Sequence, residues 1–144
     1  MTLPLNGLRV VELGSSLAGP FGCRILADLG AEVIKVEPPN TGDPSRTWGQ
    51  GGEDGASAAF DAINKEKRSV VVDFHNPKDV KRLKNLLAQD IDVVIQNLRP
   101  GIAERLGIAG KDVLALNSAI VYCDITAYGG EGPMKSLPGY DVLL

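Results

Sequence analysis

The sequence has no apolar run approaching the roughly 20 residues that a membrane-spanning helix requires. Near the N-terminus, Asn6, Gly7 and Arg9 interrupt any apolar core that a signal peptide would need. We therefore expect a cytoplasmic protein that does not enter a membrane.

Cysteine and histidine are scarce in this chain. The two cysteines, Cys23 and Cys123, lie far apart in a helical and a strand pattern, and the single histidine is His75. In a cytoplasmic protein this arrangement favours two buried thiols over a disulfide. A zinc site needs more Cys and His ligands than the chain offers, so we expect no metal.

Positive charge is also in short supply. The chain has 15 Lys and Arg against 18 Asp and Glu, a net charge of −3. This balance argues against binding to nucleic acid or to an anionic membrane, and an anionic ligand would need a local cluster of cations. The 144 residues, 44% hydrophobic and 23% charged, are sufficient for one globular domain with a core.

The most informative stretch lies near the N-terminus and has the pattern strand, loop, helix, strand. Residues 8–13 are mostly apolar, and the small residues 14–20 follow, with Pro20 suited to the first turn of a helix. Apolar residues at helical spacing then lead to Gly30, which fits a helix end, and to a second strand over 33–37. The pattern predicts two parallel strands joined by a helix, with a loop open to an anionic ligand.

The dinucleotide fingerprint G-x-G-x-x-G is incomplete in this loop. Its three glycine positions are occupied by Gly14, Ser16 and Gly19, so one glycine is missing. Glu37 does end the second strand, where an acidic residue would bind the ribose of NAD. Ordinary packing of strand and helix explains the glycines equally well, and an NAD site stays open only as an alternative.

The rest of the chain alternates strands and helices. Residues 40–57 resemble a long surface loop, Lys65, Lys67 and Arg68 a solvated turn, and residues 126–139 a second loop. We predict strands over 69–74 (buried by its valines), 91–95 and 119–125, and helices over 58–63, from Asn76 through Leu87, around 102–106 and over 111–116, with a new helix starting at 139–144.

Strands that alternate with helices and are apolar on both faces predict an α/β fold with a mainly parallel sheet. Ligands of such sheets bind beyond the carboxyl ends of the strands. That rule gathers four segments at one edge of the sheet: residues 15–19, 37–39, 73–75 and 97–101.

The order of these segments resembles the family III CoA-transferases, also called the CaiB/BaiF family. The matching pieces are LNGLRVVELGSSLAGPFGCRILADLGAEVIKVEPP at 5–39, GDPSR at 42–46, NKEKRSVVVDF at 64–74, QNLRPG at 96–101 with RLG at 105–107, and GYD at 139–141. The resemblance implies a Rossmann-like fold. It also implies that residues 1–144 are a single α/β domain, the amino-terminal part of a larger domain, without the linker and small domain of the family.

The resemblance further implies coenzyme A, as the acyl-CoA substrate, and a carboxylic acid as the second substrate. It implies an interlocked homodimer, or a second chain that completes the site. The residues that match CoA-binding positions of the family are Leu17, Ala18, Pro38, Val72, Asp73, Phe74, His75, Asn97, Leu98, Arg99, Arg105 and Tyr140. At Pro38 some members have an arginine, so the adenine contact there differs in this chain.

The chemistry of the residues agrees with an anionic ligand. The guanidinium group binds phosphate through two parallel hydrogen bonds, and Arg99 and Arg105 flank the start of a short helix. Either arginine could instead be an ordinary solvated side chain, and His75 could be structural.

The carboxylate nucleophile that the resemblance implies would lie about thirty residues beyond Asp141, outside this sequence. In the racemases of the family, the aspartate matching Asp141 works with a histidine about thirty residues earlier, where this chain has Gly110-Lys111-Asp112. Asp141 could also position the acyl group or cap a helix. Three functions remain: part of a CoA-transferase that is inactive alone, a non-catalytic CoA-binding module, or a racemase-like enzyme.

Overall fold

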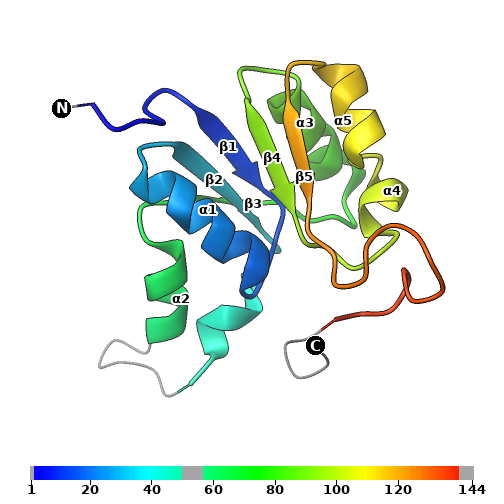
Figure 1. Ribbon diagram of the computed structural model, residues 1–144, viewed down its shortest axis with the longest axis horizontal. Coiled ribbons are helices and arrows are strands. Elements are labelled where there is room, and N and C mark those ends of the chain that lie inside the picture. The colour runs from blue at the N-terminus through cyan, green and yellow to red at the C-terminus, as the bar shows by residue number, and fades with distance from the viewer. Residues whose placement is uncertain (1, 50–56, 140–144) are drawn as a thin grey trace.

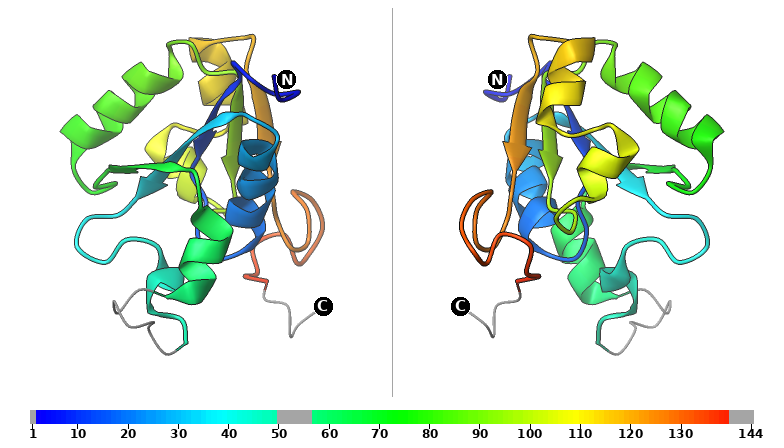
Figure 2. Two further views of the ribbon diagram at one scale, coloured as in Figure 1. Left: turned by 90° about the vertical axis from the view of Figure 1, so that its left-hand side faces the viewer. Right: turned by 90° about the vertical axis from the view of Figure 1, so that its right-hand side faces the viewer.

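The computed structural model describes residues 2–49 and 57–139. They form one five-stranded sheet with helices on both of its faces (Figures 1 and 2). Among these residues no helix is long and apolar enough to cross a bilayer. The helix start predicted at 139–144 falls, from Tyr140 onward, outside the described residues.

The elements follow the predicted alternation. In chain order they are β1 (Arg9–Glu12), α1 (Ala18–Asp28), β2 (Glu32–Glu37), the 3-10 helix η1 (Pro44–Thr47), α2 (Ala58–Asn64), β3 (Arg68–Val71), α3 (Pro77–Leu87), β4 (Val93–Gln96), α4 (Ile102–Leu106), α5 (Gly110–Leu116) and β5 (Val121–Asp124). The strand order is β3-β2-β1-β4-β5, and every pairing is parallel. The α/β fold with a parallel sheet is therefore confirmed.

The ends of the helices follow from their local sequence. Gly30 ends α1 at a φ of 104°, a value that glycine adopts without strain. Its N–H donates to the carbonyl oxygen of Ala27, and the N–H of Ala31 donates to that of Leu26, which is the Schellman pattern. At the start of α3, Asn76 accepts a hydrogen bond from the N–H of Lys78 and Pro77 follows it, as predicted.

The sheet separates two hydrophobic layers. On one face α1 packs on β1, β2 and β4 through Cys23 and Ala27, which are buried against Val10, Val33 and Ile95. On the other face, α3, α4 and α5 cover the strands. The buried residues of this second layer include Val11, Val36, Val94, Leu83, Leu87, Ala103, Val113 and Ile120. Both faces are thus covered, as a parallel sheet requires.

Two predictions of buried apolar side chains are wrong, and both concern the outermost strands. The strand predicted over 69–74 is the edge strand β3, where Val71 is 58% exposed. Cys123 lies on the other edge strand, β5, and is exposed, whereas Cys23 is buried as predicted. An edge strand has a neighbour on one side only, so side chains of the same apolar type are less covered there.

The loops after β1 and β4 diverge to opposite faces of the sheet. The chain passes from β1 to α1 on one face, and from β4 to α4 on the other (Figure 2). Since β1 and β4 are neighbours, this is the switch point of the sheet, where ligands of doubly wound folds bind.

Candidate functional site at the carboxyl edge of the sheet

The glycine loop after β1 is filled by the side chain of Asn97. The Asn97 amide accepts a hydrogen bond from Ser15 N (2.8 Å) and donates one to Ser15 O (3.0 Å). A Cβ atom added at Gly19 would lie 2.9 Å from Asn97 Oδ1, and one at Gly14 would lie closer still. These two glycines therefore make room for the asparagine that directly follows β4, and its side chain occupies the switch point.

The next residue of the loop is held from the other side. Ser16 has a φ of 68°, a left-handed conformation that is uncommon for a residue with a Cβ atom. Its N–H donates to both carboxylate oxygens of Asp43, at 3.1 and 3.2 Å. The N–H groups of Ser15 and Ser16 thus have acceptors within the protein, so a pyrophosphate bound by these amides, as in dinucleotide-binding loops, is not supported.

The carboxylate of Glu37 is also occupied by hydrogen-bond donors of the protein, so it is not available to bind a ribose hydroxyl. The carboxylate, 3% exposed, accepts hydrogen bonds from Arg46, from the Ser69 hydroxyl (2.6 Å) and from Asp43 N (2.8 Å). Burial alone would raise the pKa of Glu37, but the hydrogen bonds from Arg46, Ser69 and Asp43 N outweigh it and hold the pKa at about 2. The NAD alternative loses its acidic ligand.

Four charged side chains are buried beneath the glycine loop, and we call them the buried charge cluster: Glu12, Lys35, Asp43 and Lys67. Lys35 Nζ lies 2.6 Å from Glu12 Oε1 and 2.7 Å from Asp43 Oδ2. Lys67 Nζ lies 2.7 Å from Glu12 Oε2. Each of the four side chains is at most 2% exposed. The prediction of a solvated turn at 65–68 is therefore wrong for Lys67.

The electrostatic balance differs between the two lysines. Burial disfavours the charged form of Lys35, but the carboxylates of Glu12 and Asp43 outweigh this and raise its pKa. Burial also disfavours the charged form of Lys67, which has Glu12 but also lies near the positive Lys35, and its pKa is lowered. The sequence did contain a signal for this buried pair, because Glu12 and Lys35 are opposite charges within two apolar strands. In the sheet, Glu12 of β1 lies opposite Lys35 of β2.

The predicted segment after β3 divides into buried and exposed residues. Val72 is 6% exposed, and Phe74 packs against the hydrophobic layer of α3. The N–H of Asp73 donates to Asp79, and the carboxylate of Asp73 accepts from the N–H of His75, which is exposed. Of these four candidates, the side chain of His75 is the one most open to a ligand.

The remaining described candidates lie at the predicted edge of the sheet. Leu17 is 50% exposed, and Ala18 and Pro38 are exposed as well, at the carboxyl ends of β1 and β2. Leu98 is half-buried after β4. Because all five strands are parallel, the structure brings these segments to one edge (Figure 1).

Arg99 and Arg105 differ from the other arginines of the chain. Both are exposed, and neither is in an ion pair within the described residues. The other five arginines each pair with a carboxylate. Arg99 lies in the turn after β4, and Arg105 in α4.

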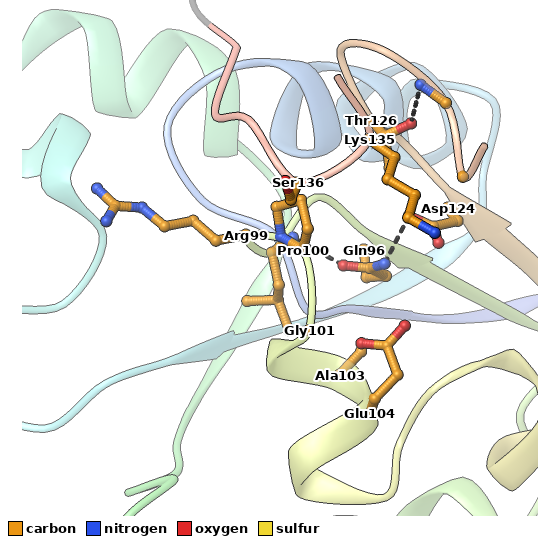
Figure 3. A pocket seen from close by; sticks show the side chains of 13 residues that line it. Gln96, Arg99, Pro100, Gly101, Ala103, Glu104, Asp124, Thr126, Lys135 and Ser136 are labelled. Carbon is orange, nitrogen blue, oxygen red and sulfur yellow. Dashed lines mark hydrogen bonds between the residues drawn. The ribbon is translucent and has the colours of Figure 1, made fainter. Parts of the chain in front are cut away.

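A pocket of about 390 Å³ lies between α4 and the loop that follows β5. Its walls include two carboxylates, Glu104 and Asp124 (Figure 3). Gln96 Nε2 donates to Asp124 at 2.6 Å, and burial, together with the nearby Glu104, raises the pKa of Asp124. The side chain of Arg99 borders the pocket and extends away from its interior (Figure 3).

The matched family model is described as CoA-transferase family III, and it covers residues 5–144. The chain belongs to this family. It is 41% identical over 140 residues to the human succinyl-CoA:glutarate CoA-transferase, and 39% identical over 137 residues to the succinyl-CoA–D-citramalate CoA-transferase of Chloroflexus aurantiacus. Its fold matches the crystal structure of a CaiB/BaiF family protein from Brucella suis with a TM-score of 0.90, at 41% identity and over 99% of this chain.

This family III chain spans about a third of the length of these curated relatives, 32% of the human and 34% of the Chloroflexus protein. It covers 38% of the Brucella chain. The matched region includes every described candidate residue. Tyr140 and Asp141 lie outside the described residues.

Proposed function

We propose that this chain supplies the CoA-binding part of an enzyme that moves coenzyme A from an acyl-CoA to a carboxylic acid. The observation that carries the proposal is the pair Arg99 and Arg105, which have no carboxylate partner within residues 2–49 and 57–139 and lie beside the carboxyl edge of a family III fold. CoA is a polyanion, and a guanidinium without a carboxylate partner is free to donate two parallel hydrogen bonds to a phosphate.

The surrounding charges support the outer surface rather than the pocket as the phosphate site. Glu104 and Asp124 line the pocket and would repel a phosphate. The guanidinium of Arg99 points away from these carboxylates (Figure 3). The phosphates of CoA would therefore contact Arg99 and Arg105 on the outside, while Leu17, Ala18 and Pro38 offer an exposed surface for the rest of the ligand.

The transfer step itself would need a carboxylate that attacks the thioester carbonyl. The attack would form a mixed anhydride and release the CoA thiolate. The thiolate would then attack the aspartyl carbonyl of the anhydride, which forms an enzyme-bound thioester and releases the carboxylate of the donor. The sequence resemblance puts this aspartate about thirty residues beyond Asp141. We therefore propose the transferase activity for a protein that also contains the remaining part of the family fold. That part could belong to the same polypeptide or to a second chain, in an interlocked dimer.

Titration of the chain with CoA, followed by calorimetry and by native mass spectrometry, tests the binding role. Loss of one charge-assisted hydrogen bond costs about 1.5–3 kcal/mol, so Arg105→Gln is expected to weaken CoA binding by about tenfold or more. Arg82→Gln removes a matched exposed arginine that pairs with Asp79 on α3, and should leave the affinity unchanged. Equal affinities in Arg105→Gln and the unmodified chain would contradict the proposed phosphate contact.

An assay with succinyl-CoA and a panel of carboxylic acids separates the transferase from a non-catalytic binding module. Succinyl-CoA is a suitable first donor because the relatives are named for it. Transfer by an assembly that includes the rest of the family fold would support the enzyme. CoA binding without transfer in that complete assembly would favour the binding module.

A further inference from the structure

We propose that the buried charge cluster (Glu12, Lys35, Asp43 and Lys67) positions the glycine loop for CoA. Its members act through the loop and do not touch the ligand. This inference rests on the proposed function, because it assigns to the loop a ligand that the cluster makes it able to bind.

Three members of the cluster reach the backbone of the loop. Asp43 accepts the N–H of Ser16 in the middle of the loop. Lys67 Nζ donates to the carbonyl oxygen of Pro20, 2.7 Å away, where the loop enters α1. Lys35 Nζ makes a longer contact, 3.4 Å, with the carbonyl oxygen of Gly14 at the start. The start and the middle of the loop, and the first turn of α1 that follows it, are each tied to the cluster.

The polar character of the cluster follows from these contacts. Buried ion pairs are often no more stabilising than well-packed apolar side chains, so stability alone does not account for four buried charges. An apolar replacement, however, would leave the Ser16 N–H without its acceptor and would remove the lysine contacts to the carbonyl oxygens of Gly14 and Pro20. Buried backbone groups without partners are rare in proteins, so the loop would adopt another conformation.

The conformation of Ser16 is the part of the loop that depends most on the cluster. A residue with a Cβ atom at a φ of 68° is strained and persists only where its surroundings determine it. Asn97 fixes Ser15 from one side, and Asp43 fixes Ser16 from the other. Leu17 follows Ser16 directly, and its exposed side chain is proposed to contact CoA. The conformation of Ser16 therefore sets the position of a proposed CoA contact.

The test compares two variants of Asp43 in the 144-residue chain. Asp43→Ala removes the acceptor of the Ser16 N–H, whereas Asp43→Asn keeps an oxygen in that place. Asp90→Ala is the control, because Asp90 is exposed at the opposite edge of the sheet. Hydrogen exchange at Ser16 reports the loop, exchange at Val113 in α5 reports the overall fold, and calorimetry gives the CoA affinity.

We expect Asp43→Ala to speed exchange at Ser16 by about tenfold or more and to weaken CoA binding by a similar factor, with Val113 unchanged. Asp43→Asn should recover most of both losses. Unchanged exchange at Ser16 in Asp43→Ala would overturn the inference, as would faster loop exchange with unchanged CoA affinity. If the unmodified chain does not bind CoA, the proposed function fails, and the exchange measurement alone decides whether the cluster holds the loop.

A second variant covers the case in which Asp43→Ala does not fold. The double substitution Glu12→Gln with Lys67→Met removes one cation and one anion, so the net charge of the cluster stays at zero. It cuts the contact to Pro20 O and leaves the pair of Lys35 and Asp43 in place. Weaker CoA binding by the folded double variant would support the positioning role, and unchanged binding would overturn it.

Discussion

Acid should destabilise this protein in part through the carboxylate of Glu37. Its pKa is about 2, against 4.5 for an ordinary glutamate. One pKa unit corresponds to about 1.4 kcal/mol, so the charged carboxylate contributes up to about 3 kcal/mol to the free energy of unfolding at neutral pH. Because the Arg46 side chain is 42% exposed, and water screens its charge, we expect about 2 to 3 kcal/mol.

The sign of the pH dependence follows from the lowered pKa. The folded state holds Glu37 ionised down to a pH at which the unfolded chain has already taken up the proton. The contribution is therefore complete above about pH 5, and is lost as the pH falls from about 4.5 toward about 2. At about pH 3 roughly half of it should remain.

Glu37→Gln isolates this contribution. The glutamine keeps the shape of the side chain but places an NH₂ group against the donors of Arg46 and Ser69. Urea unfolding measures the free energy of unfolding. The fluorescence of Trp48, the only tryptophan, reports the transition, and this residue directly follows η1. Glu32→Gln on the same strand is the control. Its ion pairs with Arg9 and Arg68 are partly open to water, so it should cost less than about 1 kcal/mol.

We expect the difference between the unmodified chain and Glu37→Gln to be about 2 to 3 kcal/mol at about pH 7, and to shrink toward about pH 3. A difference that stays constant across this range would refute the reasoning, because it would show that the charge of Glu37 does not matter. No difference at neutral pH would refute it as well.

Three further predictions concern burial. Lys67→Met leaves a buried carboxylate with one cation fewer, so urea unfolding should show a loss of about 3 kcal/mol or more, while Lys65→Met, at a 66% exposed side chain, should lie within about 0.5 kcal/mol of the unmodified chain. Gly14→Ala forces the Asn97 side chain out of the loop and should speed hydrogen exchange at Ser15, and unchanged exchange there would contradict the packing described above. A thiol reagent should modify Cys123 quickly and Cys23 only on unfolding, because burial raises the pKa of the Cys23 thiol; two fast-reacting thiols would contradict this.

The sequence predicted the alternation of elements well because each strand and helix carries its own local pattern. The helix ends at Gly30 and Asn76 depend on residues within one turn, and they were predicted correctly. The exposure of Val71 and Cys123 was not predicted, because it depends on the order of the strands in the sheet. Local composition does not reveal which strands become the edges.

The candidate site was predicted by position more than by contact. The rule for parallel sheets predicted that the candidate segments meet at one edge of the sheet, and the structure places them there. Neither that rule nor the family resemblance indicated that Asn97 would fill the glycine loop, or that Lys67 would be buried under it. Both features join residues more than 45 positions apart, and such partners become visible only when the chain is folded.

The contact between Asn97 and Ser15 also bears on the order in which the protein folds. The two residues are separated by 82 positions, so the loop cannot reach its final shape until β1 and β4 have paired. Closing so long a stretch of chain is slow compared with forming a helix. A nascent chain that has made β1, α1 and β2 therefore has the glycine loop without its native shape. Competence to bind a ligand at this edge should arise late, together with the closure of the sheet.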